Sequence, residues 1–234
     1  MATNDSGQPT RRNFLGSLAT GAAALGIATF ASPLRVNGEN ENPFEIPGDT
    51  NPEEMFKKIK GKHKVVFDVT EPHEIFPFAW PKVFLLTNAM TGTPEKENSV
   101  VVVLRHAAIP YAMEDRLWEK YKFGELFKID DPKTKAPSVR NPFWQPKPGD
   151  FQVPGLGNVA IGINELQDSG VMFCVCNMAM TVYSAVAAMK MNMDAAEVKK
   201  DWDSGILPNI QPVPSGVWAV GRAQEKGCGY IFVG

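Results

Sequence analysis

The apolar run from Val100 to Leu104 is the feature that most constrains how this chain can fold. A strand with one face in water shows polar residues at every second position, whereas this run has none. It must therefore be covered on both faces. Strands of this kind occur in parallel sheets that carry helices on both sides. The run predicts an α/β protein.

Other apolar, β-rich segments alternate with helix-like segments along the chain. The expected strands are Lys64–Val69, Ser99–Arg105, Val171–Cys176, Ile210–Val213 and Cys228–Val233. The expected helices are Pro77–Ala89, Pro110–Tyr121, Asn158–Ser169, Met178–Met191, Ala195–Ser204 and Gly216–Lys226. This alternation favours right-handed crossovers, so the sequence predicts a three-layer α/β sandwich with a mainly parallel five-stranded sheet.

Residues 1–31 differ from the rest of the chain. The pair Arg11 and Arg12 precedes Phe14, and a mildly apolar, Ala/Gly-rich run follows over 16–30. The segment resembles a twin-arginine signal peptide with cleavage near Ala31, although an ordinary amphipathic first helix would also accommodate it. A membrane-spanning helix needs about 20 strongly apolar residues, and no later segment meets that requirement. We expect export by the Tat translocase to the periplasm, with no membrane span after signal removal.

Beyond the signal, residues 32–62 are polar and rich in Pro, Gly and Asn, so we expect an extended N-terminal arm. Order is expected to begin near His63, giving an α/β domain over 63–234. Within it, the prolines of 124–154 exclude regular structure and predict a long loop insertion. Its aromatic residues suit a lid or subunit-contact arm, or equally a surface wrap anchored in the core.

The charge balance and the cysteine count exclude several classes of protein. With 24 basic and 26 acidic residues, the chain has no excess positive charge to bind nucleic acid. Three cysteines are too few for a disulfide framework. The three histidines lack metal-ligand spacing, so we expect no metal. A site assembled in space from His73, His106, Cys176 and a carboxylate is the one arrangement left open.

Reactive side chains follow the expected strands at their carboxyl ends. In an open α/β sheet ligands collect at this edge, because loops converge there and helix N-termini point their free N–H groups towards it. The residues placed there are Asp68, Thr70, Glu71 and His73 after the first strand, Arg105 and His106 after the second, Cys176 at the end of the third, and Pro214, Ser215 and Gly216 after the fourth.

Cys176 is the strongest candidate for a reactive residue in this set. It ends a strand, and Asn177 is a plausible N-cap for the long helix that follows, so the sulfur would face the positive end of the helix dipole. Arg105 or His106 on a neighbouring strand end could further favour a nucleophilic thiolate. The competing interpretation is a small buried apolar residue, which we prefer for Cys174 and also for Cys228.

Several segments in the C-terminal third resemble the DsrE/DsrF-like family. They are Leu166-Gln-Asp-Ser-Gly-Val-Met-Phe-Cys-Val-Cys-Asn177 with the helix after it, Val213-Pro-Ser-Gly-Val-Trp218 and Gln224-Glu-Lys-Gly-Cys-Gly-Tyr-Ile231. Upstream, Val103-Leu-Arg-His-Ala-Ala-Ile-Pro110, Leu117–Tyr121 and Arg140-Asn-Pro-Phe143 are similar to a Tat-exported, uncharacterised subgroup.

The resemblance implies a flavodoxin-like three-layer fold, a homo-oligomer that is a trimer or hexamer, and a cysteine that carries persulfide sulfur. Cys176 matches that cysteine, and a sulfur donor or acceptor protein would be its partner. Whether the chain is only a carrier or also a sulfurtransferase stays open, and no cofactor is expected. The residues assigned to the site are Cys176, Arg105 and His106 for chemistry, and Asn177, Ser215, Gly216 and Asp68 for ligand binding.

Two other hypotheses stay open. The first is a non-catalytic oligomeric module that binds a small ligand, a metal or a partner at the strand ends. The second is a thiol protein that reacts with peroxides or disulfides, for which a sulfenate on Cys176 would be the mark.

Overall fold

A five-stranded sheet in which all pairings are parallel organises the computed structural model, which describes residues 45–48 and 51–234. The strands are β1 (His63–Val69), β2 (Asn98–Leu104), β5 (Met172–Cys176), β6 (Ile210–Val213) and β7 (Gly229–Val233), in the spatial order β6-β5-β2-β1-β7. The predicted strands are therefore all present, with ends that differ from the predicted ones by a single residue or none.

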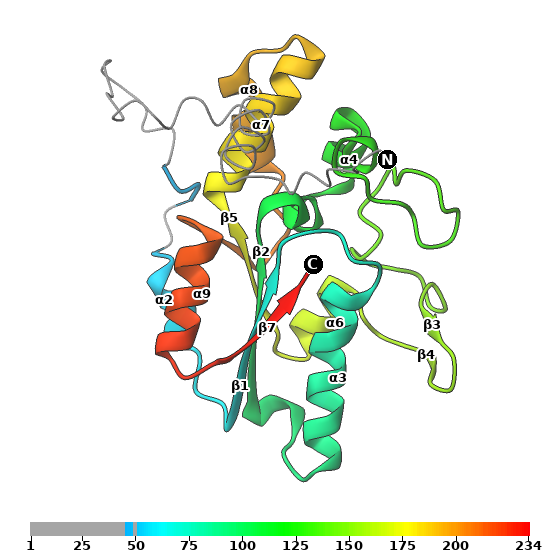
Figure 1. Cartoon of the computed structure of the whole chain (residues 1–234), viewed down its shortest axis with the longest axis vertical. Coiled ribbons are helices and arrows are strands. Elements are labelled where there is room, and N and C mark those ends of the chain that lie inside the picture. The colour runs from blue at the N-terminus through cyan, green and yellow to red at the C-terminus, as the bar shows by residue number, and fades with distance from the viewer. Residues whose placement is uncertain (1–44, 49–50) are drawn as a thin grey trace, which may run out of the picture. The chain divides into compact units, whose positions relative to one another are not determined.

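The sheet has helices on both faces, which gives the predicted three-layer α/β sandwich (Figure 1). Helices α3 (Phe76–Met90) and α6 (Ile163–Asp168) lie on one side, and α2 (Glu53–Lys57) and α9 (Gly216–Glu225) lie on the other. Helices α7 (Asn177–Met191) and α8 (Ala195–Ser204) form the connection between β5 and β6. Strand β2 lies at the centre, and its seven residues are all buried, as the apolar run predicts.

The helix predicted over Pro110–Tyr121 is wrong as a single element. The chain forms a 3-10 helix over His106–Ala112, then an interruption, then helix α4 (Asp115–Tyr121). Pro110 has no N–H to donate within a helix, and Met113 in the interruption forms a β-bridge with Ile206 instead. The bridge to Ile206 means that a distant segment of the chain stabilises this break.

Two predictions around the proline-rich insertion also need correction. Helix α6 begins at Ile163 rather than near 158, because 157–158 forms strand β4 (Gly157–Asn158), paired with β3 (Gln152–Val153). The insertion itself opens on a short helix, α5 (Phe123–Phe127), so it is not wholly irregular. Phe143 and Phe151 are buried and their rings stack 4.9 Å apart, as a surface wrap with aromatic anchors requires.

The chain is already ordered before His63, which corrects part of the predicted extended arm. Helix α2 buries Met55 and Phe56, and Ile59 just beyond it is also buried. The Phe56 ring meets that of Trp218 on α9 edge-on at 5.5 Å. Two buried residues of the helix and one just after it dock this short segment on the sheet, which the polar composition around them concealed.

The predicted signal peptide over 1–31 and most of the predicted arm lie outside the described residues. Within the described part of the chain, none of the helices combines the length and apolar character needed to cross a bilayer.

Asp201 joins α8 to α4 through three hydrogen bonds. Its carboxylate accepts from Arg116 Nη1 at 2.6 Å, from Lys120 Nζ at 2.6 Å and from the Tyr121 hydroxyl at 2.7 Å. Burial alone would raise the pKa of Asp201, but these donors outweigh it and lower the pKa from 3.8 to about 2. The carboxylate therefore stabilises the fold above the unfolded-state pKa, and this contribution is lost as the pH falls towards 2.

We expect Asp201→Asn to lower the free energy of unfolding by about 1 kcal/mol at neutral pH, because solvent screening reduces the roughly 2 kcal/mol that the pKa difference represents. The difference between variant and wild type should shrink between about pH 4 and pH 2. Urea unfolding across that range measures it, and a difference that stays constant with pH would contradict the assignment.

Candidate functional site

An ion pair between Asp68 and Arg105 lies at the carboxyl edge of the sheet. The Arg105 side chain donates from Nε to Asp68 Oδ1 at 2.6 Å and from Nη2 to Oδ2 at 2.9 Å. The Asp68 carboxylate is 4% exposed, whereas the Arg105 side chain is 27% exposed. Both residues belong to the predicted site, and the geometry shows that Arg105 is held by Asp68 in a bidentate pair rather than pointing freely at a ligand.

Tyr230 of β7 completes this network and was not among the predicted site residues. Its hydroxyl donates to Asp68 Oδ2 at 2.9 Å, while the residue itself stays 46% exposed. Burial raises the pKa of Tyr230, and the bond to Asp68 adds to that effect. A tyrosine in an otherwise apolar strand was the signal in the sequence, since its hydroxyl needs a polar partner when the ring is part of a sheet.

Gly216 lies against the same arginine, and Ser215 precedes it where α9 begins. A Cβ atom added to Gly216 would lie 2.5 Å from Arg105 Cβ, so only glycine leaves room for the Arg105 stem. Ser215 is the N-cap of α9, and its Oγ accepts from the Trp218 N–H at 3.2 Å. The two residues therefore position Arg105 and the start of α9, and the Ser215 hydroxyl is occupied as a cap.

Cys176 ends β5 and is itself the N-cap of α7. Its Sγ accepts a hydrogen bond from the Ala179 N–H at 3.3 Å, so the sulfur sits at the positive end of a 15-residue helix. The residue is 6% exposed. The hydrogen bond to Asp68 raises the pKa of Arg105 above its usual value, and negative charge on the Cys176 sulfur adds to that rise, which places the two groups within electrostatic reach.

Asn177 does not cap this helix, contrary to prediction. It is the first residue of α7 and is fully buried, and its Nδ2 donates to the Glu45 carbonyl at 3.0 Å. The N-cap is the residue before the helix, whose backbone is still extended, and here that residue is Cys176. Helix α7 therefore begins one residue earlier than an Asn177 cap would require. With Cys176 as the cap, the sulfur contacts the helix N-terminus directly. Asn177 instead holds the segment around Glu45.

His106 lies at the same edge but faces a different partner. It adopts a left-handed backbone with φ of 51° and is exposed, and its Nε2 lies 3.1 Å from the Tyr183 hydroxyl of α7. Burial raises the pKa of Tyr183, and the charge of Glu71 adds to the rise. Tyr183 was not predicted, because its position inside a helix with small residues gave no sign that it faces the strand ends.

The other two cysteines have the structural character that was predicted. Cys174 is fully buried, and burial raises the pKa of its thiol. Burial likewise raises the pKa of Cys228, against a smaller opposing effect from Lys64. All three cysteines are free thiols. Burial without a stabilising donor disfavours the thiolate, so Cys176 is the cysteine whose surroundings suit nucleophilic chemistry.

The remaining predicted strand-end residues are not assembled into a metal site. His73 packs its ring against Phe76 and Trp80, at 5.1 Å and 6.3 Å between centroids. Thr70 uses its backbone, donating from N–H to the Val233 carbonyl and accepting at its carbonyl from the Ala107 N–H. In the described residues, no group of three or more His, Cys, Asp or Glu side chains is close enough to hold a metal ion.

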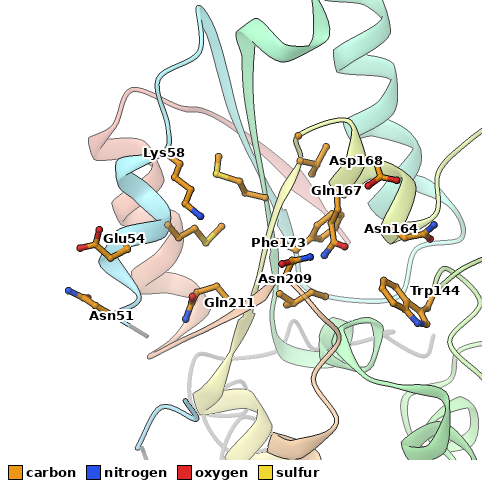
Figure 2. Close-up of a pocket in the computed structure, with 15 residues that line it drawn as sticks. Asn51, Glu54, Lys58, Trp144, Asn164, Gln167, Asp168, Phe173, Asn209 and Gln211 are labelled. Atoms are coloured by element: carbon orange, nitrogen blue, oxygen red, sulfur yellow. The ribbon is translucent and has the colours of Figure 1, made fainter. Parts of the chain in front are cut away.

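A large open pocket of about 820 Å³ lies away from these residues, at the amino ends of β5 and β6. It exists because β6 begins at Ile210, opposite Phe173, which leaves the start of β5 without a neighbour on that side. Figure 2 shows side chains from α2 on one side and from Trp144 and α6 on the other, with Phe173 between them. Its polar lining includes Asn51, Glu54, Lys58, Asn164, Gln167, Asn209 and Gln211. None of the predicted site residues lines it.

The carboxyl edge therefore offers a sulfur at a helix N-terminus, within electrostatic reach of a fixed guanidinium. Helix N-termini and guanidinium groups in general favour a nearby anion, and here the Asp68 carboxylate fixes where the positive charge lies. Chemistry that such a site can perform is nucleophilic attack by sulfur or the holding of an anionic sulfur species.

Comparison with known proteins leaves the family open. No family model and no curated protein matches the chain. Among solved structures, the chain is similar to the protein of unknown function MTH1491 from Methanobacterium thermoautotrophicum, with 18% identity and a TM-score of 0.37. That match covers 74% of this chain and 100% of the other.

Proposed function

We propose that this chain is an exported sulfur carrier, similar to DsrE/DsrF-like proteins, in which Cys176 holds one sulfur atom as a persulfide. The observation that carries the proposal is the position of Cys176 Sγ, which accepts from the Ala179 N–H at the start of α7 and lies within electrostatic reach of Arg105. We further propose export to the periplasm through the Tat translocase, assembly as a homo-oligomer and exchange of sulfur with a partner protein.

The transfer step needs only a donor that itself carries a persulfide. The Cys176 thiolate attacks the terminal sulfur of the donor R–S–SH, a new S–S bond forms at Cys176, and the donor's own S–S bond breaks. The donor leaves as the thiolate R–S⁻, so the negative charge passes from Cys176 to the donor and no external oxidant is used. Delivery to an acceptor thiolate is the reverse of this step.

Each neighbouring group has a distinct role in this proposal. Arg105 and the α7 N-terminus stabilise anionic sulfur, and Asp68 with Tyr230 fixes the guanidinium in place. Gly216 lets the Arg105 stem lie against α9. His106 and Tyr183 are paired with each other at the same edge and could contact the approaching donor.

The proposal is tested by loading the reduced protein with a small persulfide donor and mapping the product by peptide mass spectrometry. The expected result is the added mass of one sulfur atom on the peptide that contains Cys176, removed by dithiothreitol. An adduct confined to the Cys228 peptide, or no adduct at all, would contradict the proposal.

A second candidate function rests on the 820 Å³ pocket, which is independent of Cys176. Its amide side chains, the charged side chains of Glu54 and Lys58, and the Trp144 ring suit a small polar ligand with an apolar face. In that case the chain is a binding module that performs no sulfur chemistry.

Native mass spectrometry of the protein purified from its own cells distinguishes the two functions. For a binding module we expect a non-covalent adduct that Trp144→Ala removes and Cys176→Ser retains, because Trp144 lines the pocket and Cys176 does not. If wild type carries no non-covalent adduct, or if Trp144→Ala keeps the adduct, the pocket holds no ligand and this second function is contradicted.

A further inference from the structure

Among the residues that the structure describes, strand β7 is an edge strand that lacks the features that normally keep an edge from pairing. It ends the strand order β6-β5-β2-β1-β7, and its residues contain no charge and no proline. Its side chains are exposed on both faces: Tyr230 is 46% exposed, Ile231 36% and Phe232 51%. An apolar, uncharged edge of this kind presents unpaired N–H and C=O groups together with apolar surface, which is a template for another strand.

The opposite edge of the sheet is closed to such pairing. Strand β6 has four residues, and one of them is Pro212, which has no N–H to offer to an added strand. Contacts between β7 of one copy and β6 of the next would build an open filament, and Pro212 works against them. The available partner for β7 is therefore β7 of a second copy, related by a two-fold axis, which runs antiparallel and closes after two chains.

Charges at the two ends of β7 fit this antiparallel arrangement. At its amino end, Lys64 Nζ donates to the Lys226 carbonyl at 3.2 Å, so two lysines lie together there. At its carboxyl end, β7 is bonded to the backbone of Thr70, and the exposed Glu71 follows immediately. A two-fold axis through the middle of β7 brings the lysine end of each copy beside the Glu71 end of the other, twice per pair.

We propose that the chain forms a two-fold pair with a second copy of itself through antiparallel β7–β7 contact, centred near Ile231 and flanked by lysine-to-Glu71 attraction. The same contact covers the exposed ring of Tyr230, whose hydroxyl donates to Asp68. The inference does not depend on the persulfide chemistry. A hexamer can be built from three such pairs, whereas a trimer cannot.

Light scattering coupled to size-exclusion chromatography of the purified chain tests the pairing across a dilution series. We expect wild type to contain an even number of copies, and Ile231→Lys to raise the dissociation constant of the pair by roughly a hundredfold, because it buries two lysines in an apolar contact. The matched control is Val217→Lys on α9, a residue that is 67% exposed and away from β7. Wild type as a monomer or trimer, or an Ile231→Lys protein that keeps the full assembly, would overturn the proposal.

A charge exchange tests the orientation and does not depend on the folding of Ile231→Lys. Glu71→Lys should weaken the pair about tenfold, because it replaces attraction with repulsion at both ends of the contact. Lys226→Glu should weaken the pair less, because Lys64 keeps a positive charge at the same end. The double variant Glu71→Lys/Lys226→Glu should pair more tightly than Glu71→Lys alone, since the two exchanged charges again attract each other. Absence of this gain would refute the antiparallel arrangement.

Discussion

Replacing Cys176 with serine is expected to abolish the persulfide adduct while leaving the fold intact. Serine is a favourable N-cap, and its oxygen can accept the Ala179 N–H that the sulfur accepts in wild type. The stability cost should therefore be below about 1 kcal/mol. The hydroxyl stays protonated at neutral pH and does not attack sulfane sulfur, so the intact mass after treatment with a persulfide donor should equal that of the untreated protein.

Cys228→Ser is the matched control for this loss. It removes one of the other two thiols, it is also a single-atom change, and Cys228 lies before β7 at the other end of the sheet. We expect it to keep the full adduct and the wild-type loading rate. An adduct that survives in Cys176→Ser and disappears in Cys228→Ser would transfer the chemistry to a different cysteine and refute the assignment made here.

The sheet could be predicted from the sequence because each strand is a short apolar segment bounded by polar or turn-forming residues. In β2 the absence of alternation showed directly that both faces are covered, and the structure confirms this. The helices after β2 were harder to predict. Met113 leaves the helical pattern to bridge Ile206, and a contact between residues so far apart has no local signal.

The candidate site was predictable in outline for a topological reason. Parallel strands end at one edge, so Asp68, Arg105 and Cys176 had to gather there once the strands were recognised. The pairings between them were not predictable, because they depend on register and on side-chain direction. Asp68 accepts from Arg105, which follows β2, and from Tyr230 on β7, and sequence order says nothing about which strand lies on each side of β1.

The N-cap of α7 was also not predictable, because it depends on the exact residue at which the helix begins. Asn177 has the better capping side chain, yet the helix begins one residue earlier than such a cap would need. The residue at the boundary is then Cys176, and a sulfur rather than an amide oxygen receives the free N–H. Cysteine is not a favoured N-cap residue, but at this position the helix N-terminus favours negative charge on its sulfur.

Replacing Arg105 with methionine should have the second large effect, and it separates the stability of the site from its reactivity. The change leaves the Asp68 carboxylate buried with only the Tyr230 hydroxyl as a side-chain partner in the described structure. An uncompensated buried charge of this kind costs about 3 kcal/mol of unfolding free energy. Urea unfolding at neutral pH measures that loss.

The double variant Asp68→Asn/Arg105→Met removes both charges and should recover most of the lost stability, because no buried charge is left without a partner. It should not recover reactivity. With no guanidinium near the sulfur, alkylation of Cys176 should be about tenfold slower than in wild type in both the single and the double variant. Peptide-resolved alkylation rates measure this. A double variant that is stable and reacts at the wild-type rate would show that Arg105 only neutralises Asp68 and does not act on the sulfur.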